Sequence, residues 1–126
     1  MSLRSPLGRV RGLGSAKEGT AHWWAQRVTA IALVPLALWF VASILSLIGA
    51  DYATTTAWIG MPVPAVLLIL LLTATFYHAQ LGLQVVLEDY VHNEGLKLAA
   101  ILLVKFACLV LGLAAVFGVL KIAFQG

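Results

Sequence analysis

The apolar residues of this chain fall into three long stretches that polar or helix-breaking residues separate. They cover positions 28–50, 52–87 and 96–123. Each stretch is long enough to cross a hydrocarbon core of about 30 Å as a helix that rises about 1.5 Å per residue. The sequence therefore predicts an all-α membrane protein with three transmembrane helices.

Prolines and glycines set the expected ends of these helices. Pro35 lies inside the first span and should kink it, which a lipid-embedded helix tolerates when its neighbours satisfy the freed carbonyl. The segment 49–52 ends that span. The second stretch is too long for one helix, so we place the start of helix two near Pro62–Pro64, after a short loop over 51–61, and its end near Glu88.

The remaining segments complete the predicted organisation. Residues 1–21 are polar and rich in glycine, so we expect a tail there and a membrane anchor domain over 22–126. The apolar run after the tail is far longer than the ~7–15-residue core of a signal peptide, so we expect no cleavage. Residues 89–95 should form a turn between antiparallel helices. Lys105 lies near enough to the start of the third span to reach the interface or find a partner.

The composition excludes a water-soluble domain. Hydrophobic residues make up 62% of the 126 residues and charged residues only 10%, with a mean hydropathy of +1.00. A soluble domain needs about 25% charged residues to cover its wet surface. The single cysteine, Cys108, excludes an internal disulfide and a cysteine metal cluster. The chain also lacks a nucleophile–base pair, a phosphate loop and a carboxylate dyad, so we expect no catalysis by this chain alone.

The basic residues are distributed as a topology signal and argue against nucleic-acid binding. Eight Lys and Arg outnumber five Asp and Glu. The loop after helix two adds Lys97 to the basic residues of the N-terminal side, which are Arg4, Arg9, Arg11, Lys17 and Arg27. The positive-inside rule then predicts an N-terminus inside and a C-terminus outside. The expected location is the inner (cytoplasmic) membrane, or the mitochondrial inner membrane in a eukaryote.

His78 is the residue that most needs an explanation. It falls near the middle of helix two, about 15 Å from the interface, where ring nitrogens without partners are costly. Gly82 follows one turn later on the same face and leaves room for a flat ligand. Asp89 lies eleven residues after His78, a turn of about 20° from the same face, and Tyr90 follows it. This face suits a buried porphyrin and a second, shallower polar ligand, although a structural histidine bonded to a neighbouring helix stays open.

A second cluster precedes helix one. Trp23 and Trp24 are typical interfacial anchors. Arg27 lies on the same side of the membrane as Asp89, and it could either reach lipid headgroups or pair with carboxylates. His22 reads as a solvated tail residue, and His92 as a solvated turn residue.

These residues resemble a known family. His78 and Gly82, followed by Asp89 and Tyr90, match the H-x3-G-x6-D-Y signature of the cytochrome b556 membrane anchor of succinate dehydrogenase, in its smaller hydrophobic subunit. The start of helix one at 27–31 is similar as well, so the resemblance covers nearly the whole chain. The larger anchor subunit typically has an Arg-His pair closely after the glycine. Leu83-Gln84-Val85 stands there instead, which favours the smaller subunit.

The resemblance implies roles for individual residues. His78 would be one axial ligand of a haem b iron, with the second histidine supplied by the larger cytochrome b anchor subunit. Arg27, together with His22, would meet the haem propionates, and Tyr90 beside Asp89 would contribute to the ubiquinone site. The chain would then be a non-catalytic membrane anchor that works with an iron–sulfur subunit and a flavoprotein subunit, in the lipid bilayer, to pass electrons from succinate to quinone.

Two other functions remain open at this point. One is the cytochrome b anchor of another quinone-linked enzyme, such as a fumarate reductase, because partner potentials set the direction of the reaction. The other is a haem-free membrane scaffold in which His78 is structural. An absorption spectrum of the reduced protein with its partners separates the scaffold from the cytochromes.

Overall fold

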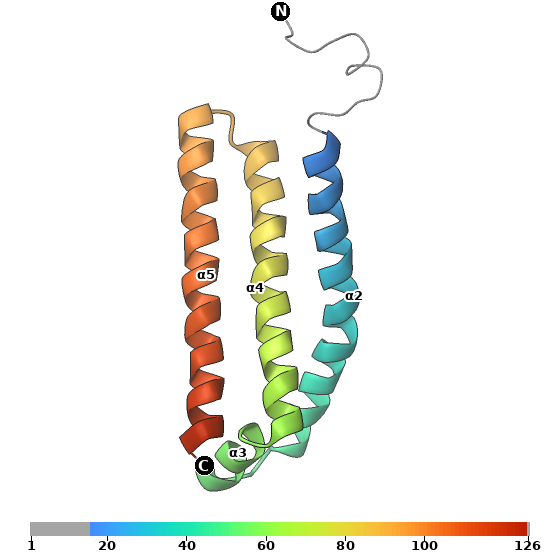
Figure 1. Cartoon of the computed structure of the whole chain (residues 1–126), viewed down its shortest axis with the longest axis vertical. Coiled ribbons are helices and arrows are strands. Elements are labelled where there is room, and N and C mark those ends of the chain that lie inside the picture. The colour runs from blue at the N-terminus through green and yellow to red at the C-terminus, as the bar shows by residue number, and fades with distance from the viewer. Residues whose placement is uncertain (1–15, 126) are drawn as a thin grey trace, which may run out of the picture.

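The computed structural model describes residues 16–125, which form four helices and no strand (Figure 1). The long helices are α2 (Ala16–Ser46), α4 (Pro62–Tyr90) and α5 (Glu94–Gln125), and α3 (Tyr52–Ile59) is a short helix between the first two. The three long helices are each apolar enough to cross a membrane. The prediction of an all-α protein with three membrane spans is confirmed.

The first helix is longer than the sequence pattern indicates. α2 begins at Ala16, so residues 16–21 of the expected tail are helical, and His22 lies on a helix. No proline lies between Ala16 and Arg27, so the residue type that most strongly breaks a helix is absent from this extension. Pro35 lies within α2 without ending it, and the ribbon curves in its lower half (Figure 1).

The expected loop over 51–61 is wrong, because α3 occupies most of it. Asp51 has an extended backbone and its carboxylate accepts a hydrogen bond from the Thr54 amide at 2.9 Å. This N-cap satisfies one of the amides that a helix start leaves unpaired, and it allows a short helix to form. Gly49 makes the preceding turn with a φ of 84°, a left-handed conformation that glycine adopts without strain.

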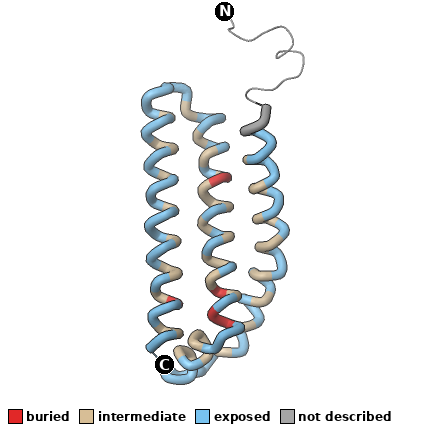
Figure 2. Tube along the Cα trace, in the orientation of Figure 1, coloured by how far each residue is buried: buried red, intermediate tan, exposed pale blue. Residues whose placement is uncertain are grey.

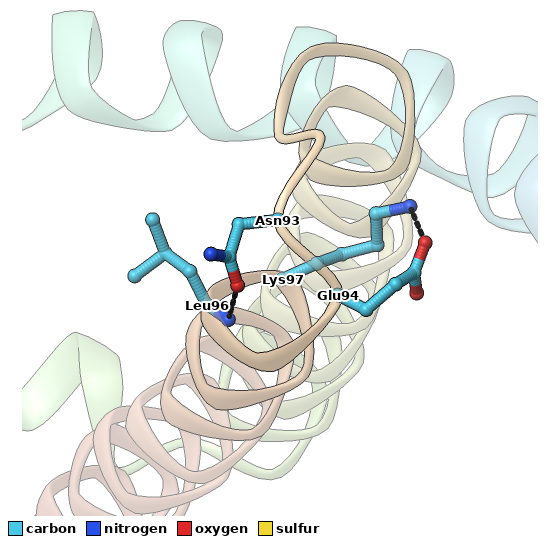
Figure 3. Close-up of polar contacts among 4 residues, drawn as sticks. All are labelled: Asn93, Glu94, Leu96 and Lys97. Carbon is cyan, nitrogen blue, oxygen red and sulfur yellow. Dashed lines mark hydrogen bonds and ion pairs between the residues drawn. The ribbon is translucent and has the colours of Figure 1, made fainter.

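The turn between α4 and α5 lies where the sequence predicts it. Asn93 caps α5, since its side-chain oxygen accepts from the Leu96 amide at 3.0 Å (Figure 3). Lys97 Nζ lies 3.2 Å from Glu94 Oε1 in the first turn of α5. The pair is solvent-exposed at its carboxylate, so it contributes little to stability and mainly keeps the turn polar.

α4 lies between α2 and α5, and the tightest packing is at the α3 end (Figure 2). There Ala65 and Leu68 of α4 meet Val119 of α5. Trp39 and Trp58 stack against this cluster with ring centroids 5.8 Å apart. At the opposite end, the buried hydrophobic side chain on α4 is Leu81. The helices therefore pack most closely at the α3 end. Most other apolar side chains are exposed, as expected for a surface that faces lipid or partner subunits.

The orientation of the bundle in the membrane stays a prediction. The basic residues that contribute most to it, Arg4, Arg9 and Arg11, lie outside the described residues. The start of α2 and the α4–α5 turn with Lys97 lie at one end of the bundle, and α3 and the C-terminus lie at the other (Figure 1). This arrangement agrees with a basic inner side and a less basic outer side.

The N-cap of α3 gives a first testable prediction. Asp51→Ala should accelerate hydrogen exchange at the Thr54 amide, because that amide loses its acceptor, whereas Asp51→Asn keeps an acceptor oxygen and serves as the control. The hydrogen bonds from Thr54 also lower the pKa of Asp51. A folded-state pKa below the unfolded value stabilises the cap at neutral pH, and this stabilisation is lost as the pH falls through the lowered pKa. Equal protection of the Thr54 amide in the wild type and in Asp51→Ala would contradict the cap.

Candidate functional site

His78 is held between two helices. Its Nδ1 atom lies 2.9 Å from Thr29 Oγ1, so the imidazole on α4 is hydrogen-bonded to α2. The ring is half-buried, and its Nε2 atom has no hydrogen-bond partner among the described residues. Within residues 16–125, therefore, only one of the two ring nitrogens of His78 is hydrogen-bonded.

A row of polar residues on α2 faces this part of α4. His22, Gln26 and Thr29 are spaced by four and three residues and so share one helix face. A Cβ added to Gly82 would lie 3.6 Å from Gln26 Nε2, an ordinary contact. The nearest side chain to Gly82 in this chain is thus Gln26. We call the five residues His22, Gln26, Thr29, His78 and Gly82 the α2–α4 seam.

Two atoms of the α2–α4 seam are buried without a partner. His22 Nε2 and Gln26 Oε1 have no hydrogen bond in the described part of the chain. The expectation of a solvated His22 is therefore wrong, since its ring nitrogen is enclosed once α2 extends back to Ala16. Buried polar atoms nearly always have partners in folded proteins, so both atoms indicate a polar partner outside the described residues.

Arg27 lies beside the α2–α4 seam on the outer face of α2. Its guanidinium carbon is 5.2 Å from the centroid of the Trp23 ring, a cation–π arrangement. Trp23 in turn meets Trp24 edge-to-face, with centroids 5.1 Å apart. No ion pair joins Arg27 to Asp89 within residues 16–125, so the guanidinium keeps its hydrogen-bond donors available.

Asp89 and Tyr90 form a separate pair near the surface, at the end of α4. Both are exposed at the last turn of α4, and 77% of Tyr90 is accessible. They lie about 16 Å along the helix axis from His78, given a rise of about 1.5 Å per residue. His92, in the turn that follows, is exposed, as the sequence predicts. The structure therefore separates the deep histidine from the surface acid–phenol pair, as the sequence indicates.

A groove of about 930 Å³ runs between α4 and α5 and reaches the start of α2. On α4 a ladder of side chains lines it, with Gln80 donating to Gln84 at 2.9 Å and Gln84 donating to Glu88 at 3.0 Å. Lys105 lines the groove from α5, and His22 from α2. His78 and the Asp89–Tyr90 pair lie outside this groove, which the sequence reasoning did not identify.

Gln26 and Thr29 are the site residues that the sequence reasoning missed. Their signal is visible in the sequence, because His22, Gln26 and Thr29 recur at helical spacing beside an apolar span. The pattern was hidden by the expectation that helix one starts near Arg27. Because that start lies after His22 and Gln26, the sequence pattern did not place these two residues on a helix.

These features define a class of protein: a small membrane protein with three apolar helices long enough to span a membrane, and with a histidine near the middle of one span whose second ring nitrogen has no hydrogen-bond partner among the described residues. Within this class, the chain belongs to the succinate dehydrogenase/fumarate reductase transmembrane subunit family, whose family model matches residues 1–112.

Individual relatives agree with this membership. The chain is 35% identical over 103 residues to the succinate dehydrogenase hydrophobic membrane anchor subunit of Rickettsia bellii, covering 82% of each protein. It is 33% identical over 114 residues to the protein of the same name from Paracoccus denitrificans, covering 90% of this chain and 88% of the relative. The resemblance to the smaller membrane anchor is confirmed. No solved structure gives a significant match.

Proposed function

We propose that this chain is the smaller membrane anchor of a succinate:ubiquinone oxidoreductase, and that it contributes half of a haem b pocket and part of a ubiquinone site. Its family membership and the names of its relatives support the anchor role. The observation that carries the haem assignment is His78, deep in α4 with Nδ1 bonded and Nε2 free. The larger anchor subunit would supply a second histidine to the haem, and the complex would reside in the inner membrane.

The residues of the α2–α4 seam fit a haem by their chemistry. A haem needs an axial nitrogen lone pair at depth and polar partners for its two propionates nearer the surface. His78 Nε2 meets the first need. The buried, unpaired Nε2 atom of His22 lies toward the start of α2, where hydrogen-bond donors for propionates are needed, and the guanidinium of Arg27 on the same helix is a further donor.

Each residue has a distinct task in this proposal. Haem b, when bound, would supply a one-electron redox centre. His78 would bind it and fix its depth, while Arg27 would offset the charge of its propionates and His22 would donate a hydrogen bond to one of them. The apolar faces of α2 and α4 exclude water from the site, which strengthens these interactions.

Asp89 and Tyr90 act on the quinone. Quinone oxygens gain negative charge during reduction, and a phenol that donates a hydrogen bond to one carbonyl stabilises that charge. Tyr90 is exposed at the end of α4, where a headgroup enters from lipid and protons enter from water. Asp89 orients the phenol or relays a proton to the reduced quinone.

The relatives favour succinate oxidation over fumarate reduction as the reaction served. The family includes anchors of both enzymes, but the matching relatives described above are named for succinate dehydrogenase.

The haem assignment predicts the behaviour of His78→Ala. The assembled complex should lose or alter its reduced b-type absorption band, since the iron loses one axial nitrogen. The haem itself can remain, held in a five-coordinate state by the partner's histidine. An unchanged band together with an unchanged midpoint potential would exclude His78 as a ligand and favour a haem-free or structural role. His92→Ala is the control, because His92 lies exposed in the α4–α5 turn.

Arg27→Leu should lower haem occupancy or shift its midpoint potential while leaving membrane insertion intact. A hydrogen bond between charged groups contributes about 1.5–3 kcal/mol, which is enough to be measured in a haem titration. Trp23→Leu is the matched control, because it removes the ring beneath the guanidinium and keeps the charge. If Arg27→Leu and the wild type bind haem alike, Arg27 serves only as a headgroup anchor.

Tyr90→Phe should slow succinate-driven quinone reduction on the order of tenfold, the effect of losing one hydrogen bond of about 1.4 kcal/mol. Succinate oxidation by an artificial dye that accepts electrons upstream should stay near the wild-type rate, as should haem content. An equal loss of both activities would indicate failed assembly. Wild-type rates in both assays would remove Tyr90 from the quinone site.

A further inference from the structure

The hydroxyl of Thr29 has three polar neighbours, and their distances decide the direction of every hydrogen bond around it. Thr29 Oγ1 lies 2.7 Å from the Ala25 carbonyl oxygen and 3.0 Å from the Gln26 carbonyl oxygen, both in its own helix. It also lies 2.9 Å from His78 Nδ1. Threonine in membrane helices commonly returns its hydroxyl to the preceding turn in this way.

The Thr29 hydroxyl has a single proton to donate among these contacts. Carbonyl oxygens only accept, so two oxygens at 2.7 Å need the hydroxyl proton between them. The hydroxyl therefore donates its one proton to the Ala25 carbonyl oxygen, with the Gln26 carbonyl oxygen as a second acceptor. No hydroxyl proton is left for His78. The contact with His78 is then a hydrogen bond in which Nδ1–H donates to Thr29 Oγ1.

We infer that Thr29 is a positioning residue that fixes the tautomer of His78. With the proton on Nδ1, the neutral imidazole carries its lone pair on Nε2, the atom without a partner in the described chain. The opposite tautomer, which free histidine prefers, would place a proton on Nε2 and block ligation. Thr29 thus prepares His78 for a metal before any metal arrives. The role of Nε2 as a haem ligand rests on the proposed function, whereas the tautomer does not.

The same hydrogen bond should tune the metal. A ligating histidine whose other ring N–H donates to an acceptor is held in one orientation and becomes more basic. A more basic ligand favours the oxidised iron, so the loss of this acceptor should raise the midpoint potential. Thr29 also links the ligand to the position of α2, which carries Arg27 two residues earlier.

Three variants test this inference. Thr29→Val keeps the shape of the side chain and removes the hydroxyl, and Thr29→Ser restores the hydroxyl. Thr56→Val is the matched control, because the Thr56 hydroxyl makes the same bonds to its preceding turn, at 2.9 Å to Tyr52 O and 3.2 Å to Ala53 O, without contacting a histidine.

The first readout is independent of haem. Nitrogen-15 NMR of the full chain in lipid bilayers, with the His78 signal assigned by its disappearance in His78→Ala, should show a protonated Nδ1 and a bare Nε2 in the wild type. Thr29→Val should shift the population toward the Nε2–H tautomer, and Thr29→Ser and Thr56→Val should match the wild type. A wild-type His78 protonated on Nε2, or a Thr29→Val spectrum identical to the wild type, would overturn the inference.

The second readout is the assembled complex. Thr29→Val should raise the midpoint potential of the haem and weaken haem affinity about tenfold, the lower end of the effect expected from removing a partner of a metal ligand. Thr29→Ser and Thr56→Val should leave both unchanged. An unchanged potential and affinity in Thr29→Val, or equal shifts in Thr56→Val, would contradict the tuning role. If the tautomer result holds while His78→Ala leaves the haem band intact, the proposed haem function fails and the tautomer assignment stands.

Discussion

In the hydrocarbon layer a polar side chain finds hydrogen bonds only within protein, and the pairing of His78 with Thr29 follows from that constraint. The imidazole lies near the middle of the second span, and α2 supplies its partner, a threonine whose own proton is already donated to the Ala25 carbonyl and which therefore acts as an acceptor. This single contact sets which ring nitrogen is bonded and which is free. The same register of α2 against α4 places Gln26 beside Gly82.

The distribution of packing explains why the site lies where it does. The Trp39–Trp58 stack and the core around Leu68 fasten the three long helices at the α3 end. The opposite end has little buried hydrocarbon and carries the α2–α4 seam, with unpaired atoms on His22 and Gln26. Dense packing at one end and unpaired polar atoms at the other fit the proposal that a haem and partner subunits contact the α2–α4 seam.

Much of this could be predicted from the sequence. Hydropathy and the Pro62–Pro64 punctuation locate the second and third spans, and the spacing from His78 to Asp89 separates a deep location from a shallow one. The N-cap of α3 and the backward extension of α2 were missed, because short-range capping and the helicity of polar segments leave weak signals in hydropathy. The Thr29–His78 contact joins residues 49 positions apart. Such a pairing depends on helix register, which no local pattern specifies.

The central claim is that His78 of this chain ligates the haem iron through Nε2. Pulsed electron paramagnetic resonance of the oxidised complex tests it directly, when this chain alone carries nitrogen-15 histidine. Loss of the nitrogen-15 coupling in His78→Ala, but not in His92→Gln, assigns that coupling to His78. The account predicts one strongly coupled nitrogen-15 axial ligand from this chain and one nitrogen-14 axial ligand from the partner. Two nitrogen-14 axial ligands, with no directly coordinated nitrogen-15, would contradict it.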